Sequence, residues 1–236
     1  RQINGQIYDS SGNKVGSELT FSNIGGNPSV SGFSNGGFVA VWDSGFANNG
    51  VAGTVFDSNY NSVANFTTSG AYPSMPRVTT LANGNFFVVF DGTSGQINGQ
   101  LFDPSANKLG AEVSISGGYG GYNEYPHVTA IENGKFVVSF TEGNNVYKRQ
   151  YDANGNAEEN AVQLYSNSSN LQGKVRLSGL SDGDYIAVWD ENNTSDGVSL
   201  GLYGQRFNSD GSASGSVFKI NTFDTSANSA TSPAQL

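Results

Sequence analysis

Short runs of apolar residues, bounded by Gly, Asn, Asp or Ser, follow one another along the whole chain. The most apolar kind of run carries β-branched and aromatic residues at nearly every position. Its four copies lie at 38–42, 86–90, 136–140 and 185–189. Because such residues favour strands and no segment has the periodicity of a long helix, the pattern predicts an all-β protein.

Three further kinds of run share this spacing. A Pro-x-Val run precedes the most apolar run, a Gly-Gln-x-aromatic-Asp motif follows it, and a looser run comes last. The acidic or amide residue of the motif recurs at 9, 57, 103, 152 and 208, in steps of 48, 46, 49 and 56 residues. Each period therefore contains four predicted strands, and the chain is a repeat protein.

The joints between the runs contain the residues of tight turns. Asn-Gly or Asp-Gly separates the first two runs at 35–36, 83–84, 133–134 and 182–183. Similar Asp- and Gly-containing segments, at 9–12 and 152–155, join the third run to the fourth. Because these residues supply the positive φ angles of hairpin turns, each period predicts a four-stranded antiparallel meander.

A repeated meander whose second strand is apolar on both faces is typical of a β-propeller blade. A stacked β-solenoid usually has shorter coils without hairpins, and two β-sandwiches would not explain one period throughout the chain. The most apolar run occurs four times and the other runs five times, which makes nineteen strands. We expect a five-bladed propeller with one incomplete blade, or an excerpt of a longer array, with repeat units at about 4–33, 37–81, 85–131, 135–180 and 184–236.

Composition excludes several kinds of site. The 236 residues include no Cys and one His, which excludes disulfides, Cys-ligated metals, thiol nucleophiles and sites with two His ligands. A net charge of −9 disfavours nucleic acid as a partner. No apolar run approaches the ~20 residues of a membrane-spanning helix, so we expect no membrane insertion. Without an initiator Met or an apolar leader at its start, the sequence suggests a processed chain or an excerpt.

The segment at 203–222 reads Tyr-Gly-Gln-Arg-Phe-Asn-Ser-Asp-Gly and ends in Phe-Lys-Ile-Asn-Thr. Together with the Pro-x-Val and Asn-Gly-x-Phe-Val-Val-x-Phe patterns, it resembles the roughly fifty-residue repeats of large secreted RTX-type bacterial adhesins and of ciliate extracellular proteins. The resemblance covers essentially the whole chain and identifies a module more than an activity. It implies secretion and a surface or adhesive role, often in calcium-rich surroundings. The Asp-Gly-Ser-Gly loops of that pattern are mostly absent here, which weakens the calcium inference.

Carboxylates follow the most apolar run in each period, and the loops after them vary most in sequence. These carboxylates are Asp43, Asp91, Glu142 (one residue later) and Asp190. They can cap turns at the strand ends or form a ligand-binding rim around the propeller axis. A glycosidase would need two carboxylates in unlike environments, which equivalent repeat positions do not provide.

Two loops carry further candidate binding residues. Tyr119 and Tyr122 interrupt a Gly-rich segment, where exposed rings beside polar groups would suit sugar recognition and packed rings would lie between blades. No cofactor is required by the sequence, but the oxygen-rich loop at 191–197 makes Asp190, Asn192 and Asp196 candidate Ca²⁺ ligands. Asn-x-Ser/Thr triplets provide candidate glycosylation sites at Asn65, Asn167, Asn192 and Asn193.

His127 occupies the repeat position that holds Ser29, Arg77 and Arg176 in the other periods, so we interpret it as an ordinary strand residue. No Gly-x-Ser-x-Gly segment exists to pair with it as a catalytic base. We therefore expect a non-enzymatic extracellular structural or adhesive module that contacts protein or glycan surfaces, in a filament or a larger assembly. The alternative is a multivalent lectin with pockets repeated over the blades. A propeller hydrolase has little support, because catalysis needs an asymmetric site.

Overall fold

The computed structural model is built from β-strands joined by turns, with no α-helix among the residues that it describes. These are residues 2–45, 50–69, 74–92, 95–116, 125–143, 145–166, 175–191 and 201–221. The strands are β1 (Ile3–Tyr8), β2 (Lys14–Ser22), β3 (Gly26–Gly32), β4 (Phe38–Asp43), β5 (Val51–Phe56), β6 (Ser62–Thr67), β7 (Ser74–Thr80), β8 (Phe86–Asp91), β9 (Ile97–Phe102), β10 (Lys108–Ser114), β11 (His127–Ala130), β12 (Phe136–Glu142), β13 (Asn145–Tyr151), β14 (Val162–Ser166), β15 (Val175–Gly179), β16 (Tyr185–Glu191), β17 (Gly201–Phe207) and β18 (Ala213–Lys219). In this part of the chain no helix has the length and apolar character to cross a membrane.

The strands form one two-stranded sheet and four four-stranded antiparallel sheets, and hydrogen-bonded neighbours are always consecutive in the chain. We call the larger sheets blade 1 (β3–β6), blade 2 (β7–β10), blade 3 (β11–β14) and blade 4 (β15–β18), and β1–β2 the N-terminal hairpin. Within a blade, the Pro-x-Val run forms the inner strand and the most apolar run the second strand. The motif forms the third strand, and the looser run forms the outer strand. The predicted four-stranded meander is therefore confirmed.

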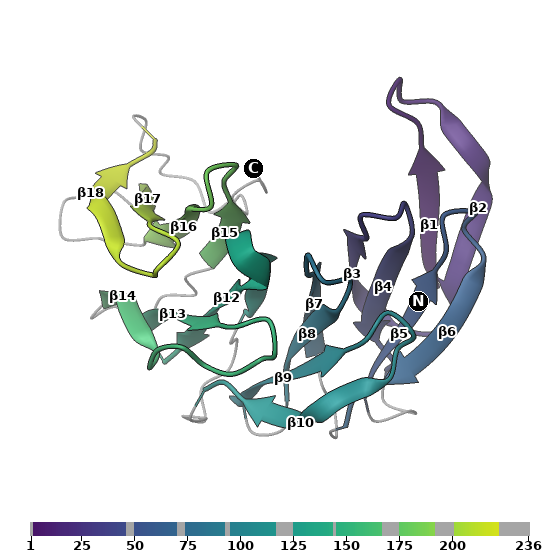
Figure 1. The fold of residues 1–236 in the computed structure, drawn as a ribbon, viewed down its shortest axis with the longest axis horizontal. Coiled ribbons are helices and arrows are strands. Elements are labelled where there is room, and N and C mark those ends of the chain that lie inside the picture. The colour runs from purple at the N-terminus through teal and green to yellow at the C-terminus, as the bar shows by residue number, and fades with distance from the viewer. Residues whose placement is uncertain are drawn as a thin grey trace.

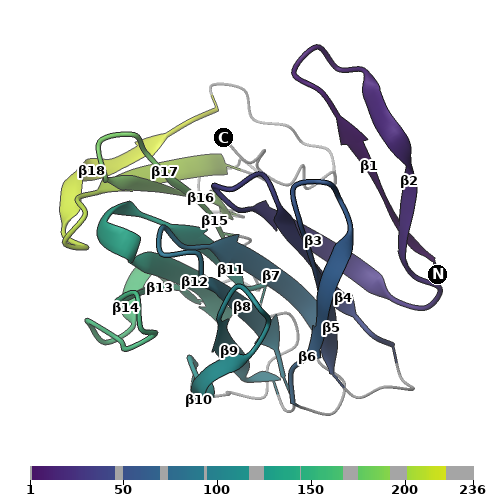
Figure 2. The same cartoon turned by 45° about the vertical axis from the view of Figure 1, so that its right-hand side comes forward.

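The blades follow one another around an arc, with the inner strands on its concave side (Figure 1). The N-terminal hairpin lies at one end of the arc and blade 4 at the other, and a view turned by 45° shows the same order (Figure 2). Each four-stranded sheet begins at the first run of the repeat, whereas the repeat units taken from the sequence begin one or more strands later. The hairpin corresponds to the third and outer strands of a blade, because β1 carries the Gly-Gln-x-aromatic-Asp motif.

In the Asn-Gly turns, the Gly adopts a positive φ angle and the Asn side chain accepts a backbone hydrogen bond. Gly36 and Gly84 have φ angles of 88° and 86°, which favour Gly because it lacks a Cβ. The side-chain oxygens of Asn35 and Asn83 each accept a hydrogen bond from the N–H two residues on, at 3.0 Å in both turns. Only in blade 3 does the Asn itself enter the left-handed region, where Asn133 has a φ of 59°.

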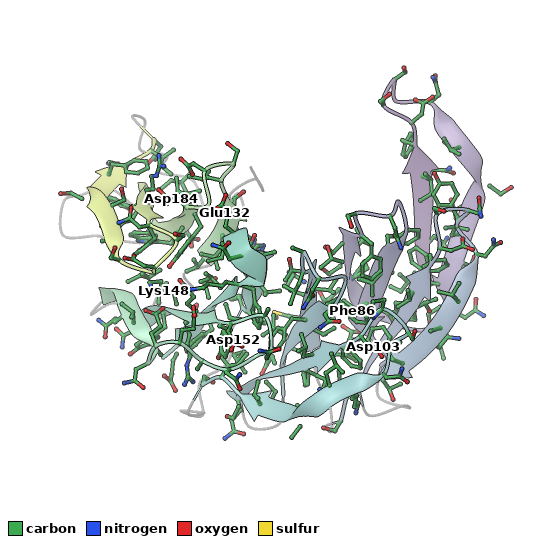
Figure 3. All side chains as sticks on the ribbon, in the orientation of Figure 1. Phe86, Asp103, Glu132, Lys148, Asp152 and Asp184 are labelled. Atoms are coloured by element: carbon green, nitrogen blue, oxygen red, sulfur yellow. The ribbon has the colours of Figure 1, made fainter. Side chains whose placement is uncertain are left out.

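The aspartate at the end of the Gly-Gln-x-aromatic-Asp motif closes the turn into the outer strand. The Asp103 carboxylate accepts hydrogen bonds from the N–H groups of Ser105 and Asn107, at 2.9 and 2.8 Å, and from Asn107 Nδ2 at 2.8 Å. The bonds from the Asn107 side chain and backbone hold the pKa of Asp103 below its ordinary value. The equivalent turns use Asp9, Asp57 and Asp152. This recurring acid is therefore a turn cap, and Figure 3 labels two examples, Asp103 and Asp152.

The second strand of blade 2 is apolar on both faces because blades 1 and 3 cover its two faces. In blade 2, Phe86 and Val88 pack into the cluster shared with blade 1, and Phe87 and Val89 pack into the cluster shared with blade 3. All four side chains are at most 1% exposed. The hydrophobic core is consequently a series of similar interfaces between successive blades.

Aromatic pairs join the second and third strands within each blade. The rings lie parallel to within 14° and their centroids are 4.5–5.1 Å apart, a geometry that adds to the burial of apolar area. The pairs are Phe38–Phe56, Phe86–Phe102, Phe136–Tyr151 and Tyr185–Phe207.

Candidate axial binding site

The variable residue of the Pro-x-Val run converges from all four blades on one pocket. Ser29, Arg77, His127 and Arg176 lie on β3, β7, β11 and β15 and line a pocket of about 350 Å³ on the concave side of the arc. Four sequence positions about 50 residues apart therefore form one polar site.

Strand alternation explains why these side chains reach the pocket. Successive residues of a strand point to opposite faces. Val78 and Val128, which follow Arg77 and His127, face the preceding blade and are only 5–6% exposed. Arg77 and His127 must therefore point the other way, toward the next blade and the concave side.

Hydrogen bonds between inner strands hold two of these side chains. The Ser29 hydroxyl oxygen accepts from the N–H of Val78 at 3.4 Å, and His127 Nδ1 accepts from the N–H of Leu177 at 3.3 Å. A neutral imidazole that accepts at Nδ1 carries its proton on Nε2. His127 is therefore fixed as a hydrogen-bond donor that lines the pocket.

The pocket has a positive electrostatic character in an acidic protein. Burial, then the positive charges of Arg176 and Arg77, lower the pKa of His127 to about 3, so this imidazole is neutral at physiological pH. Burial and then the charge of Arg176 also lower the pKa of Arg77. Arg77 and Arg176 therefore bring two positive charges to the pocket, and the Asp190 carboxylate opposes the effect of burial on Arg176.

The arginines are held by their own strands. Arg77 Nη1 donates to the Pro76 carbonyl at 2.8 Å, and Arg176 Nη1 donates to the Val175 carbonyl at 3.1 Å. A guanidinium has five N–H donors in a planar fork that matches carboxylate, sulfate or phosphate oxygens. The two backbone hydrogen bonds hold the guanidinium groups against the strands that form the pocket wall.

The predicted carboxylates do not line this pocket. Asp43 ends β4 opposite Gly26 and accepts a hydrogen bond from Asn27 Nδ2 at 2.8 Å. Asp91 ends β8 opposite Ser74. Asp190, on β16, is 9% exposed and lies near enough to Arg176 to oppose the lowering of its pKa by burial. These residues lie on second strands, behind the inner strands that form the pocket wall.

Glu142 does not share the position of these aspartates. In the repeat, Thr141 is the residue equivalent to Asp91, because Thr141 lies two residues after Ser139, which pairs with His127. Glu142 follows Thr141 and therefore points to the opposite face of the blade. The four predicted carboxylates thus do not form one ring.

Several other predicted residues lie outside the described part of the chain, namely Tyr119, Tyr122, Asn167, Asn192, Asn193 and Asp196. Asn65 is exposed on β6, where its Oδ1 accepts a hydrogen bond from the Thr54 hydroxyl at 2.7 Å. Within the described residues, no three His, Asp or Glu side chains are grouped as metal ligands.

One repeat position that sequence reasoning missed carries a buried charge. Lys148 stands where the other motifs have Gly5, Gly53, Gly99 and Gly204. Its side chain is fully buried and Nζ lies 2.6 Å from Glu159 Oε1 and 5.2 Å from the Phe207 ring centroid (Figure 3). The departure from Gly was the available signal. The ion pair and ring contact indicate a structural role between blades 3 and 4.

No family model and no curated protein matches the sequence. Solved structures do match the fold. A fucose-specific lectin from Aleuria aurantia, described as a six-bladed β-propeller, superposes with a TM-score of 0.56 at 15% identity, over 90% of this chain and 69% of the lectin. The chain has a β-propeller fold.

Two further solved structures have a similar fold. An α-L-arabinanase from Penicillium chrysogenum, complexed with arabinobiose, matches with a TM-score of 0.57 at 14% identity, over 82% of this chain and 65% of the enzyme. A protein of unknown function from Bacteroides caccae matches with a TM-score of 0.53 at 14% identity, over 89% of this chain and 86% of that protein. At these identities the similarity extends to the fold and not to the activity.

Proposed function

We propose that this protein is a non-enzymatic extracellular adhesive module that binds a partner through an anionic group held in the axial pocket. The observation that carries the proposal is the convergence of Arg77, His127 and Arg176 on one pocket. Two cationic forks and one neutral donor provide hydrogen bonds and charge for a carboxylate or sulfate group.

The overall charge of the protein limits the kinds of anionic ligand that the pocket can bind. A net charge of −9 repels extended polyanions, so nucleic acid remains a disfavoured partner, whereas an isolated acidic group can reach a local cationic pocket. An acidic sugar or an acidic side chain on a surface partner has this chemistry. The extracellular role rests on the resemblance to secreted adhesin repeats, which also favours a filament or a larger assembly as the partner.

The chemistry of the described residues supports a binding role over a catalytic one. A general base works best with a pKa near the working pH, whereas the pKa of His127 is about 3 and its Nδ1 already accepts a hydrogen bond. Asp43, Asp91 and Asp190 occupy one repeat position, so none of them is set apart as an acid or a nucleophile. We therefore expect no hydrolysis of arabinan, measured as release of reducing ends.

The proposal requires no cofactor. Asp190, the described member of the predicted Ca²⁺ set, already lies in the field of Arg176, which opposes cation binding. Excess Ca²⁺ is expected to leave the melting temperature unchanged. A clear increase would restore the calcium hypothesis.

The second candidate function is a lectin with one sugar pocket per blade, which the fold similarity to the fucose-specific lectin favours. A glycan array that carries neutral, carboxylated and sulfated glycans separates the two. Binding of acidic glycans that is lost in Arg77→Gln/Arg176→Gln supports the axial site. Binding of neutral glycans at several sites per chain, unchanged in that variant, supports the lectin.

The control removes the same charge elsewhere. Lys14 and Lys108 are exposed, and Lys14→Gln/Lys108→Gln changes the net charge by the same amount as the axial double variant. If both double variants lose acidic ligands equally, the effect is one of overall charge and the axial proposal is wrong. If the wild-type chain binds no acidic probe, on the array or as an acidic peptide, the proposal is also wrong.

A further inference from the structure

The N-terminal hairpin leaves the first blade partly uncovered. One repeat position shows this directly, since its residues are Val30, Val78, Val128 and Leu177. Their exposed fractions are 61%, 6%, 5% and 1%. The last three face a preceding four-stranded blade, whereas among the described residues Val30 faces a two-stranded hairpin alone.

An aromatic residue of the N-terminal hairpin is likewise more exposed than its counterparts in the blades. The motif aromatic is 7% exposed in Phe56, 0% in Phe102 and 2% in Tyr151, but 56% exposed in Tyr8. In each complete blade this ring stacks on the first aromatic residue of the second strand. Tyr8 lies on β1, which pairs with β2 alone among the described strands, so no second strand is present to supply that ring.

A cavity of about 620 Å³ lies between the hairpin and blade 1. Gly5, Ile7 and Phe21 line it from the hairpin, and Val30 and Phe38 line it from blade 1. At the equivalent place between blades 1 and 2, second-strand valines fill the interface and cover the repeat position of Val30. The cavity therefore has the position and the apolar lining of a missing second strand.

We propose that β1 accepts a second strand of this same repeat pattern, a Phe-Val-x-Val strand that follows an Asn-Gly turn, supplied by polypeptide outside residues 1–236. The four such second strands of the sequence all lie in β4, β8, β12 and β16, and each already pairs on both edges. An exposed sheet edge binds an added strand through main-chain hydrogen bonds, and side-chain pockets provide specificity.

The complete blades define the register of the added strand. In blade 1, Phe38 pairs with Phe56 and Val41 pairs with Gly53. By repeat equivalence, the first aromatic residue of the added strand lies opposite Tyr8 and its fourth residue lies opposite Gly5. The second and fourth side chains then enter the cavity. Ser29 and Val30 line both this cavity and the axial pocket, so the two sites adjoin one another.

A labelled peptide of residues 74–91, the inner hairpin of blade 2, tests the proposal by fluorescence anisotropy against the intact chain. We expect saturable binding of one peptide per chain. Val30→Asp, which places a charge in the cavity, should weaken binding at least tenfold. The Phe87→Asp/Val89→Asp peptide, altered at the two side chains that enter the cavity, should bind at least tenfold more weakly as well.

Val63→Asp is the matched protein control. Val63 is 57% exposed on the outer strand β6 and is not among the residues that line the cavity. Equal loss of binding in Val30→Asp and Val63→Asp would overturn the proposal, as would equal binding by the two peptides. Failure of the peptide to bind would also overturn the proposal. Sedimentation would then show whether a second copy of the chain fills the edge of β1, in which case the chain is a dimer, or the chain fills that edge itself as a monomer.

Discussion

Truncation of Val78 measures how strongly one blade holds the next. Val78 is 6% exposed and packs in the cluster that blades 1 and 2 share. Val78→Ala removes two buried methyl groups, worth about 0.8 kcal/mol each in transfer, and leaves a cavity, which together predict a loss of about 2–3 kcal/mol. For a chain of this length, that loss corresponds to a fall in melting temperature of roughly 4–12 °C.

Val30→Ala provides the internal control for this measurement. Both valines lie on inner strands at the same repeat position, so the change in strand propensity is similar and the difference between the variants reports burial. Because Val30 is 61% exposed, its truncation should change stability by only about 0.5 kcal/mol. Urea unfolding at pH 7 measures both. Equal losses in the two variants would refute the described blade order.

Three further predictions concern charged and titratable side chains. The pKa of His127 is about 3 in the folded state, below the ordinary 6.5. The stability that depends on the neutral imidazole is therefore complete above pH 6.5 and is lost as the pH falls toward 3. His127→Gln should reduce this loss of stability, measured by urea unfolding. Because hydrogen bonds lower the pKa of Asp103 in the folded state, Asp103→Ala should reduce the melting temperature at pH 7. The effect should shrink as the pH falls below 3.8, because the carboxyl becomes protonated first in the unfolded chain and, at lower pH, in the folded chain. Glu159→Gln leaves the buried Lys148 charge without its partner and should cost about 3 kcal/mol, whereas Lys148→Met should cost less; an equal cost in thermal melts would contradict the ion pair.

The repeat made the blades predictable from sequence because each strand and turn has its own local signal. Apolar second strands, Asn-Gly turns and the motif aspartate specify hairpins through nearest-neighbour geometry alone. The burial of residues such as Phe86 and Phe87 on opposite faces of one strand follows from that pattern. The sequence did not show which run begins each sheet, because a repeat of four strands can be divided at any of its four turns.

The axial site depended on long-range geometry. Arg77, His127 and Arg176 share a repeat position that was visible in the sequence, yet each alone has the environment of an ordinary strand residue. Their convergence requires the curvature of the arc, which no local pattern encodes. Grouping polar residues by repeat position would have exposed the signal.

Glu142 was grouped with the aspartates in the sequence, although it does not share their repeat position. Its placement one residue after the aspartate position suggested a shared rim, but a shift of one residue reverses the face of a strand. Comparing the second strands residue by residue assigns the position to Thr141 instead. Likewise, the exposure of Val30 and Tyr8 appears only when each repeat is compared with its neighbours in space.

Backbone hydrogen exchange, resolved by residue with NMR, tests the blade assignment most directly. β9 pairs with strands on both edges and should be protected at successive residues. In the part of the chain that the structure describes, β1 pairs only with β2, so its amides should alternate between slow and fast exchange. Alternating protection in β1 beside continuous protection in β9 is the predicted result. Continuous protection along β1, or alternation along β9, would contradict an arrangement of four four-stranded blades preceded by the two-stranded N-terminal hairpin.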